Sequence, residues 1–96
     1  MTKKIKLNLG CGPRKKEGFT NVDALTWEGN TDIVWDLTNV PYEFVEDFEG
    51  GQVDEILSIE CLEHISFKDT YKVLREWNAI LKIGGKLQYK SLIVGK

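Results

Sequence analysis

Residues 6–23 read KLNLGCGPRKKEGFTNVD, and this stretch decides the fold class. Apolar and polar side chains alternate over Ile5–Leu9 and stop at Gly10, which predicts a β-strand. Residues 10–18 hold three glycines and a proline, so they are predicted to form a loop. A second short strand is predicted over Phe19–Asp23. One strand therefore ends on glycines and the next on a carboxylate.

The composition is that of a soluble globular domain. The 96 residues are 42% hydrophobic and 29% charged, which suits one domain spanning residues 1–96 with a single core. A net charge of −2 gives no general attraction for nucleic acid or for an anionic membrane. No apolar run is long enough to span a membrane or to serve as a signal peptide, and two cysteines do not make a disulfide framework. We therefore expect a cytoplasmic protein.

Further along the chain, predicted strands alternate with predicted helices. The strands cover Asp32–Trp35, Val53–Ile59 and Lys86–Val94, and a short helix is predicted over Pro41–Phe48. Residues 24–31 are too polar and too broken by glycine for a helix. This order predicts an α/β fold with a small doubly wound parallel sheet.

The best helix signal follows Ser66. Ser66 can cap the helix, Asp69 stands at a capping-box position, and Gly84-Gly85 is predicted to end the helix. Steps of four and three residues predict one apolar stripe facing the core, formed by Phe67, Tyr71, Leu74, Trp77 and Leu81.

The sheet is predicted to carry helices mainly on one face. Strands covered on both faces are apolar throughout, whereas the first strand alternates, with Leu7 and Leu9 on one face and Asn8 on the other. Right-handed crossovers place both predicted helices on one side. We expect loops carrying Trp27 or Phe19, or another chain, to cover the opposite face.

The strand ends carry the chemistry. Ligands of open α/β sheets bind beyond the carboxyl ends of the strands. Gly10 and Gly12 let a ligand approach the main chain, and their amides can hold an anion. Asp23 can accept hydrogen bonds from ribose hydroxyls, and Asp36 from an exocyclic amine. The set fits an adenosine with an anionic group, although a plain tight turn explains the glycines equally well.

Two nucleotide-binding motifs fit less well. The dinucleotide fingerprint needs a third glycine at position 15, which is Lys15, and no good helix follows. A phosphate-binding P-loop is excluded because no Gly-Lys-Ser/Thr follows the turn. A nicotinamide-binding domain remains a weaker alternative.

An ordered set of motifs resembles the class I S-adenosylmethionine-dependent methyltransferases, and most of all their small bacterial and phage members. The motifs are LNLGCGP, GFTNVD, DIVWDL, VDEI, CLEHI, LREW and LKIGGKL. The resemblance implies a Rossmann-like sheet of order 3-2-1-4-5 and S-adenosylmethionine as the cofactor. The cofactor-binding residues that it implies are Asn8, Gly10, Cys11, Gly12, Asp23, Asp36, Leu37 and Glu60.

Within that set, Gly10, Cys11 and Gly12 would line the methionine part of the cofactor, Asp23 would bind the ribose, and Asp36 with Leu37 would border the adenine. Methyl transfer from a sulfonium mainly needs alignment, so a general base is optional. Glu60 and His64 are the candidate bases, although a structural histidine, capped or satisfied in the core at a helix start, is the simpler reading of His64.

The chain departs from the family pattern in three ways. Asn8 stands where an acidic residue is usual, Arg14 stands where a third glycine is common, and the chain ends after the fifth strand. We therefore expect it to lack the usual C-terminal segment. The fifth strand would then be an exposed edge, which invites a homo-oligomer through that strand or through the uncovered sheet face.

Two functions stay open at this point. One is methyl transfer to an unknown small-molecule or saccharide-like acceptor; the other is a truncated, non-catalytic S-adenosylmethionine-binding module acting through a partner. A metal site is not expected, because Cys61, His64 and Cys11 lack a convincing fourth ligand. Cys11 is more simply a small turn residue than a nucleophile, because no base is placed beside it.

Overall fold

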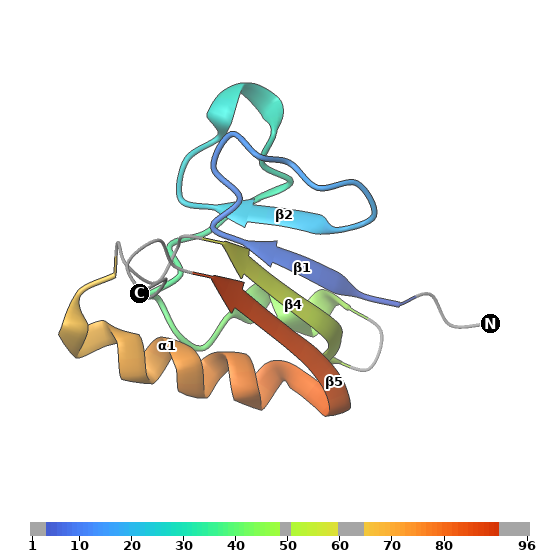
Figure 1. Cartoon of the computed structure of the whole chain (residues 1–96), viewed down its shortest axis with the longest axis vertical. Coiled ribbons are helices and arrows are strands. Elements are labelled where there is room, and N and C mark those ends of the chain that lie inside the picture. The colour runs from blue at the N-terminus through green and yellow to red at the C-terminus, as the bar shows by residue number, and fades with distance from the viewer. Residues whose placement is uncertain (1–3, 49–50, 60–64, 91–96) are drawn as a thin grey trace.

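The computed structural model describes residues 4–48, 51–59 and 65–90 and forms a five-stranded parallel sheet. The order along the sheet is β3-β2-β1-β4-β5, which confirms the predicted Rossmann-like arrangement (Figure 1). The strands are β1 (Lys6–Leu9), β2 (Thr20–Asp23), β3 (Ile33–Val34), β4 (Val53–Ile59) and β5 (Leu81–Lys90). All four neighbouring pairs are parallel, so the carboxyl ends of β1, β2 and β3 meet at one edge.

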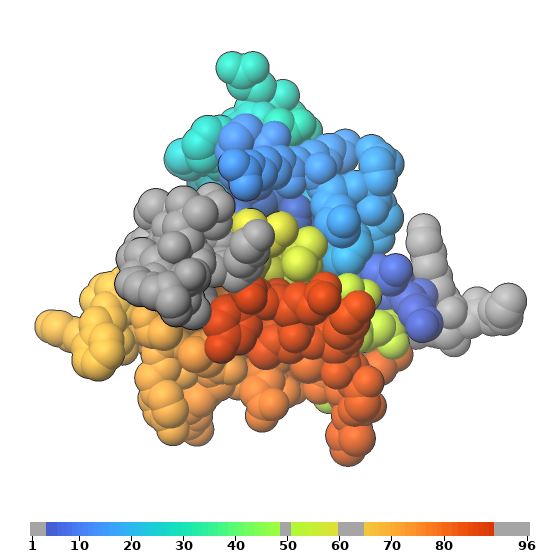
Figure 2. Space-filling model, in the orientation of Figure 1, coloured from blue at the N-terminus to red at the C-terminus, as the bar shows by residue number. Residues whose placement is uncertain are grey.

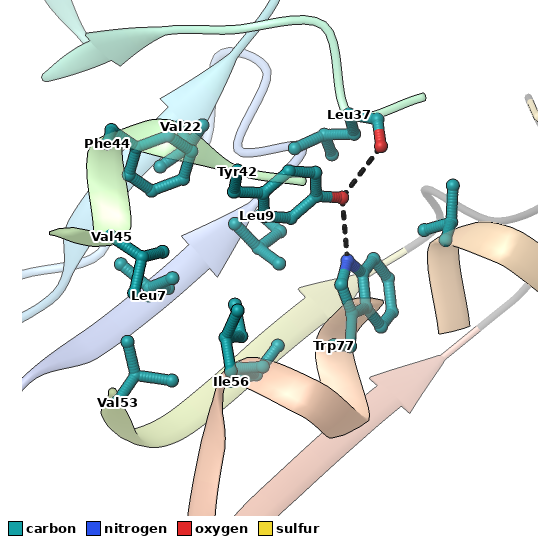
Figure 3. Close-up of a cluster of buried hydrophobic side chains, with 12 residues drawn as sticks. Leu7, Leu9, Val22, Leu37, Tyr42, Phe44, Val45, Val53, Ile56 and Trp77 are labelled. Carbon is teal, nitrogen blue, oxygen red and sulfur yellow. Dashed lines mark hydrogen bonds between the residues drawn. The ribbon is translucent and has the colours of Figure 1, made fainter. Parts of the chain in front are cut away.

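The core lies on a single face of this sheet. Leu7 and Leu9 of β1 are fully buried there with Val22 of β2 and Ile56 of β4 (Figure 3). Helix α1 (Phe67–Ile80) and the 3-10 helix η2 (Glu43–Asp47) both pack on this side, as the crossover rule predicts. The burial of these apolar side chains is the main force that holds the helices to the sheet.

One polar chain crosses that core. The Trp77 indole N–H donates to the Tyr42 hydroxyl over 2.9 Å, and the Tyr42 hydroxyl donates to the Leu37 carbonyl over 2.7 Å (Figure 3). The Tyr42 amide donates to the Glu76 carboxylate over 2.6 Å. These bonds tie α1 to the segment that follows β3.

The predicted core stripe of α1 is wrong at its first two members. Phe67 is 94% exposed and Tyr71 is 70% exposed, whereas Val73, Trp77 and Ile80 are the buried residues. Leu74 packs against the core from the margin, and Leu81 already belongs to β5. The buried residues also follow steps of four and three, so a second stripe with the same period faces the sheet.

The sequence predicted the start of α1 correctly but not its end. Ser66 caps the helix as predicted, because its side chain accepts a hydrogen bond from the Lys68 amide. The predicted end at Gly84-Gly85 is wrong, since the helix stops at Ile80. The register moves from Val53 opposite Leu81 to Glu55 opposite Lys86, so residues 82–85 bulge out of β5, and Gly84 there has a φ of 83°.

Two other predictions needed adjustment. The short helix predicted over Pro41–Phe48 is the 3-10 helix η2, and one 3-10 turn, η1 (Trp27–Gly29), lies in the segment predicted to be without helix. η1 is a single turn, which a polar, glycine-containing segment can form without nucleating an α-helix, whereas η2 has five residues and buries Phe44 and Val45. Strand β5 lies at the edge of the sheet, as expected, but its predicted end at Val94 falls outside the described residues.

The opposite face of the sheet carries no helix among the described residues. The loop after β1 covers part of this face, because the Asn8 side chain, which points to this face, donates to the Arg14 carbonyl of the loop. The Phe19 ring also lies on this face with the Lys6 ammonium above it, as predicted for a face covered by loops. Figure 2 shows β4 at the floor of a hollow between this loop and β5. Within the described ranges, no helix is long and apolar enough to cross a membrane.

Candidate functional site

The tip of β1 turns sharply on its two glycines. Gly10 has a φ of 74° and Gly12 a φ of 56°, values that side chains with a Cβ rarely adopt. The amides of Gly10 and Cys11 both donate to the Val22 carbonyl, over 2.8 and 3.1 Å. A Cβ placed on Gly12 would meet no heavy atom within 4 Å among the described residues. The turn therefore leaves open space beside its main chain.

The tip of β2 contacts that turn directly. The Gly12 amide donates to Asp23 Oδ2 over 2.9 Å, and the Leu25 amide donates to Asp23 Oδ1 over 3.0 Å. An ionised carboxylate has about four acceptor positions, so these two bonds leave room for further donors. The glycine turn and the carboxylate predicted to act together are thus within hydrogen-bonding distance of each other.

The tip of β3 joins the same edge. The Trp35 amide donates to the Asp23 carbonyl over 2.8 Å, which places Asp36, the next residue, one step beyond β2. Asp36 is exposed, and its Oδ1 accepts from the amide and the hydroxyl of Thr38 over 2.9 and 2.8 Å. These two hydrogen bonds lower the pKa of Asp36, so it stays a charged acceptor at neutral pH.

Leu37 has a different environment from the one the resemblance implies. Its side chain is 8% exposed and belongs to the core cluster beside Tyr42 (Figure 3). Its carbonyl is occupied by the Tyr42 hydroxyl. The adenine contact implied for Leu37 stays a prediction, and the core packing of the residue is what the structure adds.

Asn8 lies beneath the glycine loop rather than at its open side. It is 5% exposed, and its amide nitrogen donates to the Arg14 carbonyl over 3.2 Å and to Asn21 Oδ1 over 2.8 Å. A direct cofactor contact for Asn8 stays a prediction, while the observed bonds pin the loop to the sheet. An acidic residue could accept hydrogen bonds here but could not make these donations.

Asn21 is the residue that the sequence analysis missed. It is fully buried, and its Oδ1 accepts from the Lys16 amide over 2.9 Å as well as from Asn8. Its amide nitrogen donates to the Phe19 carbonyl and to Asp32 Oδ2, over 3.2 and 3.0 Å. The signal was available: a polar residue in the middle of a buried strand needs partners, and Asn8 and Asn21 lie side by side in the register.

Cys11 is a buried thiol. It is 5% exposed, and its Sγ lies 3.8 Å from the Thr31 hydroxyl. Burial raises the pKa of Cys11, which keeps the group protonated and weakly nucleophilic. These contacts favour the reading of Cys11 as a small turn residue.

The two candidate bases, Glu60 and His64, lie outside the described residues, as does Cys61. In the ranges that are described, no group of three or more His, Cys, Asp or Glu side chains could hold a metal ion. The site built from the described residues is therefore one glycine turn with two carboxylates at the neighbouring strand tips.

A family model described as a methyltransferase domain matches residues 23–88, which is well over half of the chain. The chain belongs to this methyltransferase domain family. The match begins at Asp23 and runs through β3, β4, α1 and most of β5. No curated protein and no solved structure matches the chain.

The matched part of the methyltransferase domain does not include the glycine turn. Gly10 and Gly12 precede residue 23, so their role in ligand binding rests on their own geometry and on the bond to Asp23. The family supports methyltransferase activity in general, and such domains typically use S-adenosylmethionine.

Proposed function

We propose that this methyltransferase domain binds S-adenosylmethionine at the carboxyl edge of β1, β2 and β3 and transfers its methyl group to a small-molecule acceptor. One observation carries the proposal. The tips of the three strands are joined by two hydrogen bonds to Asp23, from the Gly12 amide to its carboxylate and from the Trp35 amide to its carbonyl. The bare main chain and the carboxylates needed for a nucleoside therefore lie at one place.

The residues at this edge suit the chemical groups of the cofactor. The open side of the turn at Gly12 would admit the amino-acid part, because no described side chain fills it. The spare acceptor positions of Asp23 would take the ribose hydroxyls. Asp36, held in its charged form by Thr38, would accept from the adenine amine.

When bound, S-adenosylmethionine supplies an electrophilic methyl group on sulfonium. The chain's own task is then to hold the acceptor in line with that methyl and to keep water away. A base is needed only where the acceptor keeps its proton at working pH. We assign that optional role to Glu60 or His64, which follow β4 in the sequence.

The acceptor is proposed to be a small molecule or a saccharide-like one rather than a polymer of high charge. The net charge of −2 gives no long-range attraction for a polyanion. Asp23 and Asp36 place negative charge at the proposed binding edge, which disfavours a strongly anionic acceptor there.

A calorimetric titration with S-adenosylhomocysteine tests the cofactor assignment. Asp23→Ala should weaken binding by about 1–3 kcal/mol, the cost of removing a charged hydrogen-bond acceptor. Asp47→Ala is the matched control, because it removes an exposed carboxylate from η2, away from the three strand tips. Equal affinity of wild type and Asp23→Ala would remove the ribose role, and tighter binding of NAD than of S-adenosylhomocysteine would favour a dinucleotide site.

Methyl transfer itself needs a second measurement. The protein is incubated with S-adenosylmethionine carrying a labelled methyl group and with fractions of small molecules. Label appearing in a fraction only with the active chain, and not with Asp23→Ala, supports transfer. Binding of the cofactor without transfer to any fraction favours the non-catalytic module.

A further inference from the structure

A pocket lies at the opposite edge of the sheet, beside the residues where β1 and β2 begin. Figure 1 shows these starts at the end of the strands away from their tips. The pocket has a volume of about 310 Å³, and its lining residues are Lys4, Ile5, Lys6, Gly18, Phe19 and Thr20. The glycine turn and Asp23 stand at the other ends of the same two strands. This pocket is therefore separate from the proposed cofactor site.

Positive charge converges on one aromatic ring in this pocket. The Lys6 and Lys16 ammonium groups each lie 5.5 Å from the centre of the Phe19 ring. Lys6 comes from β1 and Lys16 from the loop after it, so two separate segments bring their charges to the same place. Lys4 adds a third ammonium to the lining. The ring face attracts cations and holds both side chains near the pocket.

These three lysines have no carboxylate partner within ion-pair distance among the described residues. The ion pairs formed there are Lys72 with Asp69 and Lys82 with Asp54. Asp54 is the acidic neighbour of Lys4, but its carboxylate already accepts from the Ile5 amide over 2.7 Å and from Lys82. The register also sets Glu55 of β4 opposite Lys6, so neighbouring carboxylates balance this cluster in part, although none of them forms an ion pair with it among the described residues.

We propose that this pocket binds the phosphate group of a small phosphorylated molecule. Like charges gathered around one concave site repel one another, and a bound anion of two charges relieves that repulsion. Lysine ammonium groups act as point charges for phosphate, and Thr20 brings a hydroxyl to the same lining.

The volume of the pocket and the net charge of the chain favour a small ligand over a polymer. A volume of about 310 Å³ is at the lower end of small-molecule pockets. The net charge of −2 and the single cluster give no extended basic track for a nucleic acid. Ile5 and Phe19 supply an apolar wall for the remainder of the ligand.

The test uses the full chain labelled with ¹⁵N and titrated with pyrophosphate at constant ionic strength. Amide signals of Gly18, Phe19 and Thr20 should shift and saturate. Lys6→Gln and Lys16→Gln should each weaken binding about tenfold, as for loss of one charge-assisted hydrogen bond. Lys15→Gln is the matched control, because it removes the same charge from the same loop, and Lys15, unlike Lys16, does not lie over the Phe19 ring; it should change affinity by less than about twofold.

Four results would overturn the proposal. One is a loss of affinity in Lys15→Gln equal to that in Lys6→Gln and Lys16→Gln, which would indicate only a general positive field. Another is the absence of saturable shifts up to about 10 mM pyrophosphate. The third is tighter binding of a short single-stranded oligonucleotide than of pyrophosphate through the same amides, which would replace the small ligand by a nucleic acid. Shifts at Gly10–Gly12 instead of Gly18–Thr20 would also contradict the assignment.

Discussion

The two faces of the sheet are held by different forces. On the face covered by α1 and η2, Leu7, Val22 and Ile56 pack with no water contact, and one hydrogen-bonded chain from Trp77 crosses them. On the other face, Asn8 and Asn21 are equally buried but are held by hydrogen bonds to the loop after β1.

The two faces therefore have different roles: one determines the stability of the fold and the other the geometry of the candidate site. Apolar packing is strong but non-directional, so the helix face supplies most of the folding energy without fixing a loop. Hydrogen bonds of buried amides are directional, so the asparagine face sets where the glycine turn lies. We therefore expect damage to the first face to unfold the domain and damage to the second to loosen the loop first.

Among these variants, Trp77→Ala is expected to lower the free energy of unfolding the most. Trp77 is fully buried against the sheet, and truncating such a residue costs about 3–5 kcal/mol. That loss approaches the whole stability of a small domain, so urea unfolding monitored by circular dichroism should find the variant largely unfolded.

Phe67→Ala is the matched change on the same helix. Phe67 is 94% exposed, so its loss should change the free energy of unfolding by less than about 0.5 kcal/mol. Comparable losses in the two variants would restore the predicted stripe and reject the helix orientation described here.

Trp77 and Phe67 also show which feature of α1 the sequence could not predict. Apolar periodicity predicted the existence and start of α1, and strand alternation predicted which side of β1 faces the helices. It could not choose between two stripes that share Trp77, because Phe67 and Tyr71 satisfy the same steps as Val73 and Ile80. The choice is made by packing against the sheet, which a local pattern does not contain.

The next largest effect is expected for Asn21→Ala. The change leaves the Lys16 amide without its acceptor and leaves the buried Asn8 side-chain amide with the Arg14 carbonyl alone, at a cost of about 1–3 kcal/mol. Hydrogen exchange measured by NMR should show the Lys16 amide losing protection while core amides of β4 keep theirs.

Asn30→Ala serves as its control. The Asn30 side chain is half-buried and makes one exposed bond of 3.3 Å, to the Pro13 carbonyl, so its loss should leave the Lys16 amide protected. Unchanged protection in Asn21→Ala would show that the loop is held by something other than the asparagine pair.

The candidate site was predictable in part for a related reason. Glycines and carboxylates at strand ends are local signals, and parallel topology then brings the ends of β1, β2 and β3 together. The bond between Gly12 and Asp23 joins residues eleven apart, and no local rule specifies it. The burial of Leu37 depends on Tyr42 and α1, so it too lay beyond a reading of strand ends.

A smaller effect is expected for Tyr42→Phe. The change removes the hydroxyl that accepts from Trp77 and donates to the Leu37 carbonyl, and it should cost about 1–2 kcal/mol in urea unfolding. Tyr71→Phe removes the same atom from a side chain that is 70% exposed and should have almost no effect. If the two variants lose equal stability, the hydroxyl chain does not bind α1 to the segment after β3.

The smallest effect is a dependence of stability on pH. The Ile5 amide, and after it Lys82, lower the pKa of Asp54. A carboxylate whose pKa is lower in the folded state stabilises the fold above its unfolded pKa of about 3.9, and that contribution is lost as the pH falls through the folded value.

Urea unfolding at pH 7, pH 5 and pH 3 should therefore give a shallower decline in the free energy of unfolding for Asp54→Asn than for wild type. Asp47→Asn, which removes an exposed carboxylate from η2, is the control for the loss of one negative charge. The Asp54 carboxylate joins β4 to Ile5, just before β1, and to Lys82 of β5. If Asp54→Asn and wild type lose the same stability as the pH falls, these bonds to the ionised carboxylate do not stabilise the sheet.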